Sequence, residues 1–198
     1  MLPLVLGLLI FFLVHLAPTQ VDLRRGLVER FGLVGYKVIF SALSLVGLVL
    51  IIVGYGKMQV MVGKNPEIWT PPIWARHLTF LFMLPAMVLL VAAYEPSRIR
   101  TATKHPMLAA IKFWAAGHLL ANGDLASILL FGSFLAYAVY DRISVKRREA
   151  VQPPAPVATA TSWWNDALVV VLGLALYGFM LTVGHARLIG VPLLPGWY

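Results

Sequence analysis

The sequence predicts an all-α, polytopic integral membrane protein with about six transmembrane helices and both termini on the outer side. Three observations predict this fold. Of the 198 residues, 60% are hydrophobic and 12% are charged, whereas soluble domains have about 45–50% and about 25%. Six segments approach the roughly 20 apolar residues that cross a bilayer. The basic residues between these segments are distributed unevenly over the two sides.

The six expected spans form one membrane domain over residues 1–198. They are predicted at Leu2–Leu16, Val38–Gly54, Ala75–Tyr94, Pro106–Ala121, Leu125–Tyr140 and Ala167–Ala186. The first lacks a basic n-region and a small-residue cleavage site, so we interpret it as a retained helix and not as a signal peptide. Residues 150–162 are rich in proline and alanine and predict a flexible cytoplasmic linker.

The fourth and fifth spans are separated by Asn122-Gly123-Asp124. Asn-Gly is a tight-turn signal, and Asp124 can cap the amide groups that open the next helix. The rival interpretation is one long helix with Asp124 in the hydrocarbon. A hairpin is favoured, because a charge at that depth would be costly.

The loops differ in positive charge. The first, third and fifth loops contain Arg24, Arg25, Arg30, Lys37, Arg98, Arg100, Lys104, Arg142, Lys146, Arg147 and Arg148, against Lys57, Lys64, Arg76 and Arg187 on the opposite side. Basic loops stay in the cytoplasm, which places both termini outside. The same pattern accounts for the net charge of +8, so nucleic acid is excluded as a partner and membrane lipid is expected.

Histidine provides the candidate chemistry. The chain has no cysteine, so imidazole is the best soft-to-intermediate metal ligand available. Ionisable groups within spans are functional candidates, and helix–helix hydrogen bonding is the alternative. The five histidines lie in or beside apolar segments: His15, His77, His105, His118 and His185. We expect His105 at the cytoplasmic interface, and His77 and His185 at the outer interface and not as ligands.

His118 has the most informative neighbours. Trp114 lies one helical turn before it, and Asn122 lies one turn after it. The small residues 115–117, with Gly117 beside the imidazole, leave room for a flat macrocycle. Close packing of membrane helices is the alternative. His15 follows two phenylalanines, and two such histidines would make a bis-histidine haem site.

Two stretches of the chain resemble NnrU proteins. The first includes Phe12-Leu13-Val14-His15-Leu16, Asp22-Leu23-Arg24 and Gly35-Tyr36-Lys37, and continues to Leu45. The second includes Thr103-Lys104-His105-Pro106 and Trp114-Ala115-Ala116-Gly117-His118-Leu119-Leu120-Ala121-Asn122-Gly123-Asp124, and it is the more specific. The resemblance covers nearly the whole chain in the correct order.

The resemblance implies a multi-pass protein of the bacterial inner membrane that is linked to denitrification and nitric oxide. Relatives of the family are the zeta-carotene isomerases, in which haem b with histidine ligands supports redox-gated cis-trans isomerisation of a carotene. Carried over, His15 and His118 are the metal ligands. From their positions beside His118, Trp114 and Gly117 are expected to contact the cofactor. His105, Asn122 and Asp124 are possible further site residues. The chain departs from the isomerases at two places. Lys104 stands where they have the arginine of an Arg-His-Pro element, and a proline-alanine linker and a sixth helix replace the cytoplasmic extension that follows their fifth helix.

The His15/His118 pair must reach the same depth to share one haem. His15 lies about 21 Å from the outer end of its helix, and His118 about 20 Å from the inner end. In a core about 30 Å thick these depths differ by roughly 10 Å. The pair meets if the fourth helix begins near Lys112.

Three functions remain open. The first is a haem b protein that acts in nitrogen-oxide-linked or redox-gated chemistry, including a haem-dependent carotenoid cis-trans isomerase with an apolar polyene substrate. The second is a non-enzymatic accessory subunit of a larger membrane complex for respiration, denitrification or photosynthesis. The third, a transporter, ranks last because no inverted repeat is evident.

Overall fold

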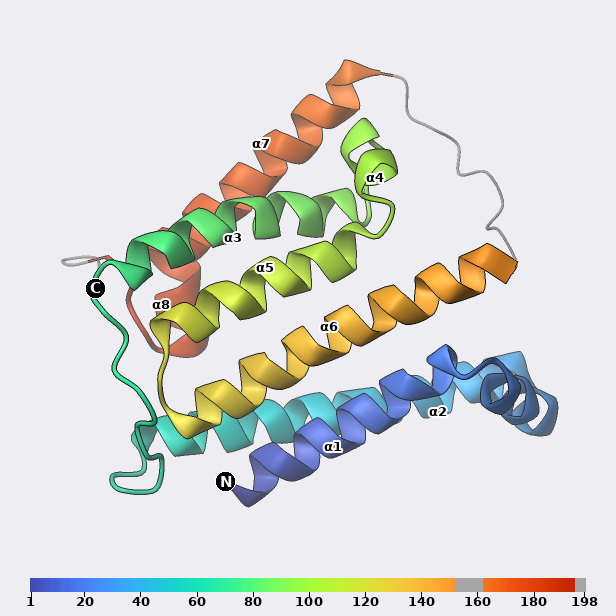
Figure 1. Cartoon of the computed structure of the whole chain (residues 1–198), viewed down its shortest axis with the longest axis horizontal. Coiled ribbons are helices and arrows are strands. Elements are labelled where there is room, and N and C mark those ends of the chain that lie inside the picture. Colours follow the sequence, from blue (N-terminus) through green and yellow to red (C-terminus); the bar gives the residue numbers. More distant parts are fainter. Residues whose placement is uncertain (152–161, 195–198) are drawn as a thin grey trace. The chain divides into compact units, whose positions relative to one another are not determined.

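The computed structural model describes residues 1–151 and 162–194, which are helical except for short connections. Most of the predicted linker 150–162 lies outside the described residues. The helices are α1 (Leu2–Leu16), α2 (Val21–Val60), α3 (Ala75–Ala92), α4 (Arg98–Thr103), α5 (Pro106–Ala121), α6 (Leu125–Val151), α7 (Trp163–Phe179) and α8 (His185–Ile189). A 3₁₀ turn, Ala17–Thr19, follows α1, and a π-helix, Met180–Gly184, joins α7 to α8 (Figure 1). The all-α prediction is confirmed.

Five helical stretches in the described residues are long and apolar enough to cross a membrane: Leu2–Thr19, Val21–Val60, Ala75–Ala92, Leu125–Val151 and Trp163–Ile189. The helix α5 is also apolar, with 16 residues, just short of the roughly 17–25 of a spanning helix. The chain is therefore a multi-pass membrane protein. The outer location of both termini stays a prediction.

Four helices show what the sequence predicted and what it missed. The spans Leu2–Leu16 and Pro106–Ala121 match α1 and α5 at both ends. The span predicted at 38–54 is part of the longer α2, and α6 continues beyond residue 140 to Val151. The added stretches contain more than half of the chain's charged residues. Hydropathy finds the part of a helix that lies in lipid, whereas the helical backbone continues as far as its hydrogen bonds do.

The helix α2 is bent at Gly32, whose φ is 70° and ψ is 163°. This backbone conformation is essentially open only to glycine. Two helical stretches, 21–31 and 33–60, therefore meet at this residue. The first stretch contains most of the charges that the sequence assigned to a loop.

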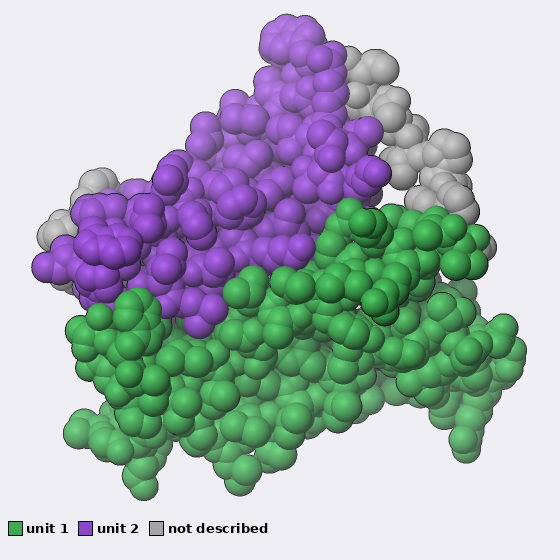
Figure 2. All heavy atoms as spheres, viewed as in Figure 1, with its two compact units in different colours: residues 1–70, 122–151 green, residues 71–121, 152–198 purple. Residues whose placement is uncertain are grey.

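The chain divides into two compact units, and each is described by itself (Figure 2). Unit 1 comprises residues 1–70 and 122–151, and unit 2 comprises residues 71–121 and 152–198. That residues 1–198 form a single membrane domain stays a prediction.

In unit 1 the backbones of α1 and α2 meet at glycines. A Cβ on Gly7 would lie 2.6 Å from the nitrogen of Ile51, and one on Gly47 would lie 2.9 Å from the nitrogen of Phe11. A Cβ on Gly54 would overlap the backbone of Leu4. Small residues allow membrane helices to approach closely enough for dispersion contacts to hold them together. This packing fixes α1, and with it His15.

In unit 2 the central helix α3 packs against α5 and α7. Gly117 of α5 lies against the side chains of Met83 and Phe82, and Gly173 of α7 lies against Val88. The hydroxyl of Thr79 donates to the carbonyl oxygen of Gly117 at 2.8 Å. The residue immediately before His118 is therefore anchored to the neighbouring helix.

Candidate functional site

His15 lies near the end of α1 in an aromatic surround. Its ring stacks on Phe11, with 3.9 Å between the ring centroids, and contacts Phe40 at 5.1 Å and Tyr137 at 6.0 Å. Its Nδ1 lies 2.8 Å from the carbonyl oxygen of Phe11. Because a carbonyl only accepts, Nδ1 bears the proton, and Nε2 is the nitrogen that would bind a metal.

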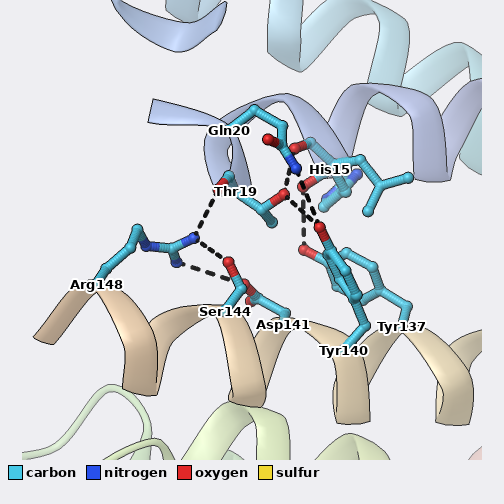
Figure 3. Close-up of polar contacts among 9 residues, drawn as sticks. His15, Thr19, Gln20, Tyr137, Tyr140, Asp141, Ser144 and Arg148 are labelled. Atoms are coloured by element: carbon cyan, nitrogen blue, oxygen red, sulfur yellow. Dashed lines mark hydrogen bonds and ion pairs between the residues drawn. The ribbon is translucent and has the colours of Figure 1, made fainter. Parts of the chain in front are cut away.

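Hydrogen bonds join the end of α1 to α6 (Figure 3). Tyr137 donates to the carbonyl oxygen of His15 at 3.3 Å, and Gln20 donates to the hydroxyl of Tyr140 at 3.1 Å. Arg148 donates to the carbonyl oxygen of Thr19 at 3.3 Å. It also donates to Ser144 at 2.7 Å and pairs with Asp141 at 3.5 Å. This network holds the His15 backbone from the side of α6.

His118 on α5 has the same local geometry as His15. Its Nδ1 lies 2.8 Å from the carbonyl oxygen of Trp114, one turn earlier. By the same reasoning Nδ1 bears the proton, and Nε2 is the nitrogen suited to a metal. The Trp114 ring lies 5.3 Å from the His118 ring, tilted by 50°, as the sequence spacing predicted.

A second imidazole faces His118. The ring of His185, the first residue of α8, lies 6.5 Å from the His118 ring, with 18° between the two planes. Its Nδ1 lies 2.7 Å from the carbonyl oxygen of Val191. Both rings therefore present the same nitrogen, Nε2, as the metal-binding atom. The sequence prediction assigned His185 to the outer interface, and the structure adds this histidine pair within unit 2.

The π-helix Met180–Gly184 positions His185. A π-helical turn contains one more residue than an α-helical turn, and such turns are frequent at functional sites. Gly184 is buried, and a Cβ there would lie 2.7 Å from the Met180 sulfur and from the Phe179 ring. The hydroxyl of Thr182 donates to the carbonyl oxygen of Gly178 at 2.8 Å. The extra residue rotates His185 relative to the register of α7.

The small residues before His118 pack against α3. Ala115 is fully buried, and a Cβ on Gly117 would lie 2.7 Å from the Met83 methyl carbon. Gly117 thus serves close helix packing, which was the alternative to making room for a macrocycle. Its predicted contact with a cofactor stays a prediction.

Asn122-Gly123-Asp124 forms the predicted turn, and it belongs to unit 1. Asp124 caps α6, as predicted, by accepting from the Ser127 nitrogen at 3.0 Å and the Ser127 hydroxyl at 2.6 Å. Asn65 donates to the same carboxylate at 2.7 Å and Gln59 at 3.3 Å. Burial raises the pKa of the Asp124 carboxyl, but these hydrogen bonds outweigh it and leave the pKa below its ordinary value.

Gly123 fits the same turn closely. A Cβ on Gly123 would overlap the carbonyl of Trp69. The Gly123 carbonyl oxygen accepts from the nitrogen of Ile68 at 2.8 Å. The role of Asn122-Gly123-Asp124 in the structure is to join the connection after α2 to the start of α6.

The Lys104-His105-Pro106 turn precedes α5. Lys104 has φ 62° and ψ −48°, and the His105 nitrogen donates to the carbonyl oxygen of Thr103 at 2.7 Å. These values describe a γ-turn of the rarer, strained hand. Pro106 then opens α5, as predicted. The turn fixes the residue at which α5 starts.

The fold and its histidines were compared with known proteins. A family model for the NnrU protein matches residues 3–193. The chain belongs to the NnrU family. No curated protein and no solved structure matches the chain.

In this NnrU-family chain the predicted site residues divide between the two units. His118, Trp114, Gly117 and His105 belong to unit 2, and His15 belongs to unit 1 with Asn122 and Asp124. The His15/His118 ligand pair stays a prediction. The structure brings His118 together with His185, for which the sequence has one signal: these two of the five histidines directly follow a glycine.

Proposed function

We propose that this NnrU-family chain binds haem b in unit 2, where His118 and His185 would hold it, and serves redox or nitrogen-oxide-linked chemistry. The observation behind the proposal is the facing pair of imidazoles. The 6.5 Å between their ring centroids is near the upper end of the range of about 4.5–7 Å for aromatic pairs.

The spacing suits a metal between the rings. A metal bonds an imidazole nitrogen at about 2 Å, and that nitrogen is about 1 Å from its ring centre, so two collinear ligands separate their ring centres by about 6 Å. The observed 6.5 Å is close to this value. The hydrogen bonds of both Nδ1 atoms to carbonyl oxygens are the usual support of metal-binding histidines.

The number of ligands favours haem over a bare metal ion. Among the described residues no group of three or more His, Asp or Glu side chains could hold a metal. Zinc requires three or four protein ligands, whereas a haem supplies four nitrogens and requires one or two axial ligands from the protein.

The chain's own residues would then set the ligand geometry. The carbonyl oxygens of Trp114 and Val191 orient the two rings and increase the basicity of Nε2. The Thr79 hydroxyl fixes Gly117, and the π-helix fixes His185. When bound, the haem would supply one-electron redox chemistry. From the resemblance, the proposed reaction is cis-trans isomerisation, and the proposed substrate is an apolar polyene.

Absorption spectroscopy of the full chain tests the proposal. The protein is expressed with haem supplementation, purified in detergent, and measured oxidised and dithionite-reduced. Wild type is compared with His118→Ala, His185→Ala and His15→Ala, and with His77→Ala as the matched control. We expect a Soret band and sharp reduced α and β bands in wild type, lost in His118→Ala, changed to a five-coordinate spectrum or lost in His185→Ala, and retained in His15→Ala and His77→Ala.

Two other outcomes would contradict the proposal. Loss of the α and β bands in His15→Ala, with retention in His185→Ala, would identify His15 and His118 as the ligand pair. A colourless wild-type protein would exclude the haem and favour the accessory-subunit function.

A further inference from the structure

A basic pocket on unit 1 is separate from the histidine pair. It has a volume of about 260 Å³ and is lined by Pro18, Arg24, Tyr36, Lys37, Phe40 and Ser41. Pockets for drug-sized ligands measure about 300–1,000 Å³. This pocket is therefore suited to a small polar group, and two of its six lining residues are cations.

Arg24 is exposed, and it lies on the apolar stripe of its helix. The stretch 21–31 is helical. Its apolar residues Leu27, Val28 and Phe31 lie three, four and seven positions after Arg24, which places all four on one stripe. The other charged residues, Asp22, Arg25, Glu29 and Arg30, lie outside this stripe. A helix of this type lies flat in the membrane interface, with its apolar stripe toward the lipid.

The surroundings of Arg24 lack a counter-charge. Its guanidinium carbon lies 5.9 Å from the centre of the Tyr36 ring. In the part of the chain that the structure describes, neither Arg24 nor Lys37 forms an ion pair with a carboxylate. By contrast, the Arg148 guanidinium at the neighbouring pocket of about 480 Å³ pairs with Asp141. No carboxylate of the described residues therefore neutralises the charges of Arg24 and Lys37 at the first pocket.

A buried hydroxyl adds a donor. The Tyr36 Oη is buried and has no hydrogen-bond partner among the described residues. A buried hydroxyl without a partner costs roughly 1–3 kcal/mol, so the Tyr36 hydroxyl is free to donate to an acceptor in the pocket that it lines. Ser41 supplies a second hydroxyl to the pocket wall. Two cations and two hydroxyl donors around a small volume match the oxygens of a phosphate group.

We propose that this pocket binds a phosphate group, with Arg24 and Lys37 neutralising its charge and Tyr36 donating a hydrogen bond from Oη. The phosphate comes from the headgroup of an anionic membrane lipid or from free phosphate. The amphipathic stretch 21–31 favours the lipid, because it holds Arg24 at the depth of the headgroups. Phe40 then connects the pocket to the aromatic surround of His15.

The test uses the full chain in detergent, with native mass spectrometry and thermal unfolding as readouts. The probes are phosphatidylglycerol, phosphatidylcholine and inorganic phosphate. Arg24→Gln/Lys37→Gln removes both cations of the pocket. Arg25→Gln/Arg30→Gln is the matched control, because it removes the same charge from the same stretch outside the pocket. Tyr36→Phe removes the buried hydroxyl and keeps the ring under Arg24.

We expect phosphatidylglycerol to bind wild type and the control in preference to phosphatidylcholine, and to raise their unfolding midpoint. Its affinity should fall about tenfold or more in Arg24→Gln/Lys37→Gln and severalfold in Tyr36→Phe. If inorganic phosphate alone reproduces the wild-type shift and displaces the lipid, the source is free phosphate. Equal losses in the pocket variant and the control, or no loss in either, would overturn the proposal. So would an unchanged affinity of Tyr36→Phe if the double variant does not fold.

Discussion

His15 in unit 1 and His118 in unit 2 share a local geometry and differ in what surrounds them. In each, Nδ1 lies 2.8 Å from the carbonyl oxygen four residues earlier. Phe11, Phe40 and Tyr137 surround the His15 ring, whereas the His118 ring faces His185. The helix alone orients an imidazole and selects its tautomer. Only packing between distant segments decides whether a second imidazole faces it.

The two histidine-bearing helices, α1 and α5, also differ in the glycine contacts that hold them against their neighbouring helices. On the α1–α2 side, a Cβ on Gly54 would meet backbone atoms of Leu4 and Pro3. On the α3–α5 side, a Cβ on Gly117 would first meet the end of the Met83 side chain. A backbone cannot move aside without moving the helix, whereas a methionine side chain can change rotamer. The position of α1 is therefore the less tolerant of change.

Glycine substitutions test this difference directly and give the largest expected effect. Gly54→Ala should lower the free energy of unfolding by about 2–3 kcal/mol, and Gly117→Ala by about 1 kcal/mol or less. Gly56→Ala is the matched control on α2, since a Cβ there meets nothing within 4 Å. It should be neutral or stabilising by up to about 1 kcal/mol. Unfolding in a denaturing-detergent titration measures all three, and equal losses at positions 54 and 117 would contradict the comparison.

The elements that the sequence predicted well are those with local signals at both ends. Pro106 begins α5 and Asn122-Gly123 follows its last residue, so the predicted range 106–121 is the observed one. Asp124 was identified as a cap from its place before an apolar run, and the bond to Ser127 confirms it. These signals act within a few residues, so that a single sequence reveals them.

The missed features depend on other kinds of information. The sequence predicts a loop for the stretch before Gly32, because that stretch is rich in charged residues. Charged residues mark the edge of the membrane, however, and a helix can continue past that edge. The π-helix has no hydropathy signature. The contact of His118 with His185 joins residues 67 positions apart, and no local rule predicts such a contact. The one feature of the sequence that these two histidines share is a preceding glycine.

The turn at Asp124, in unit 1, makes a smaller contribution to stability, and this contribution depends on pH. The pKa of this carboxyl is lowered in the folded chain. Asp124 therefore makes its full contribution to the free energy of unfolding above the unfolded-state pKa of about 3.9. This contribution is lost as the pH falls through the lower pKa of the folded chain. Asp124→Asn should cost about 1 kcal/mol at pH 6, because the charged acceptor of a half-exposed site is lost.

Thermal unfolding of wild type and Asp124→Asn at pH 3 and pH 6 tests this effect. The difference between their midpoints should be present at pH 6 and should shrink toward pH 3. Titration of the other carboxylates affects both proteins and cancels in the difference. A gap that stays constant over this range would show that the turn does not depend on the ionised form of Asp124.

The starts of the two histidine-bearing helices provide the smallest effect, with the opposite sign. The helix α1 has Pro3 in its first turn, whereas α5 follows the strained Lys104 with φ 62°. Lys104→Gly should raise the free energy of unfolding by about 0.5 kcal/mol, because the relief of backbone strain exceeds the greater unfolded-state entropy of glycine. Thr103→Gly, at a helical position, should lower it by about 0.5–1 kcal/mol. If both variants destabilise the chain in thermal unfolding, the γ-turn at Lys104 is not strained in the folded protein, and Pro106 alone fixes where the His118 helix begins.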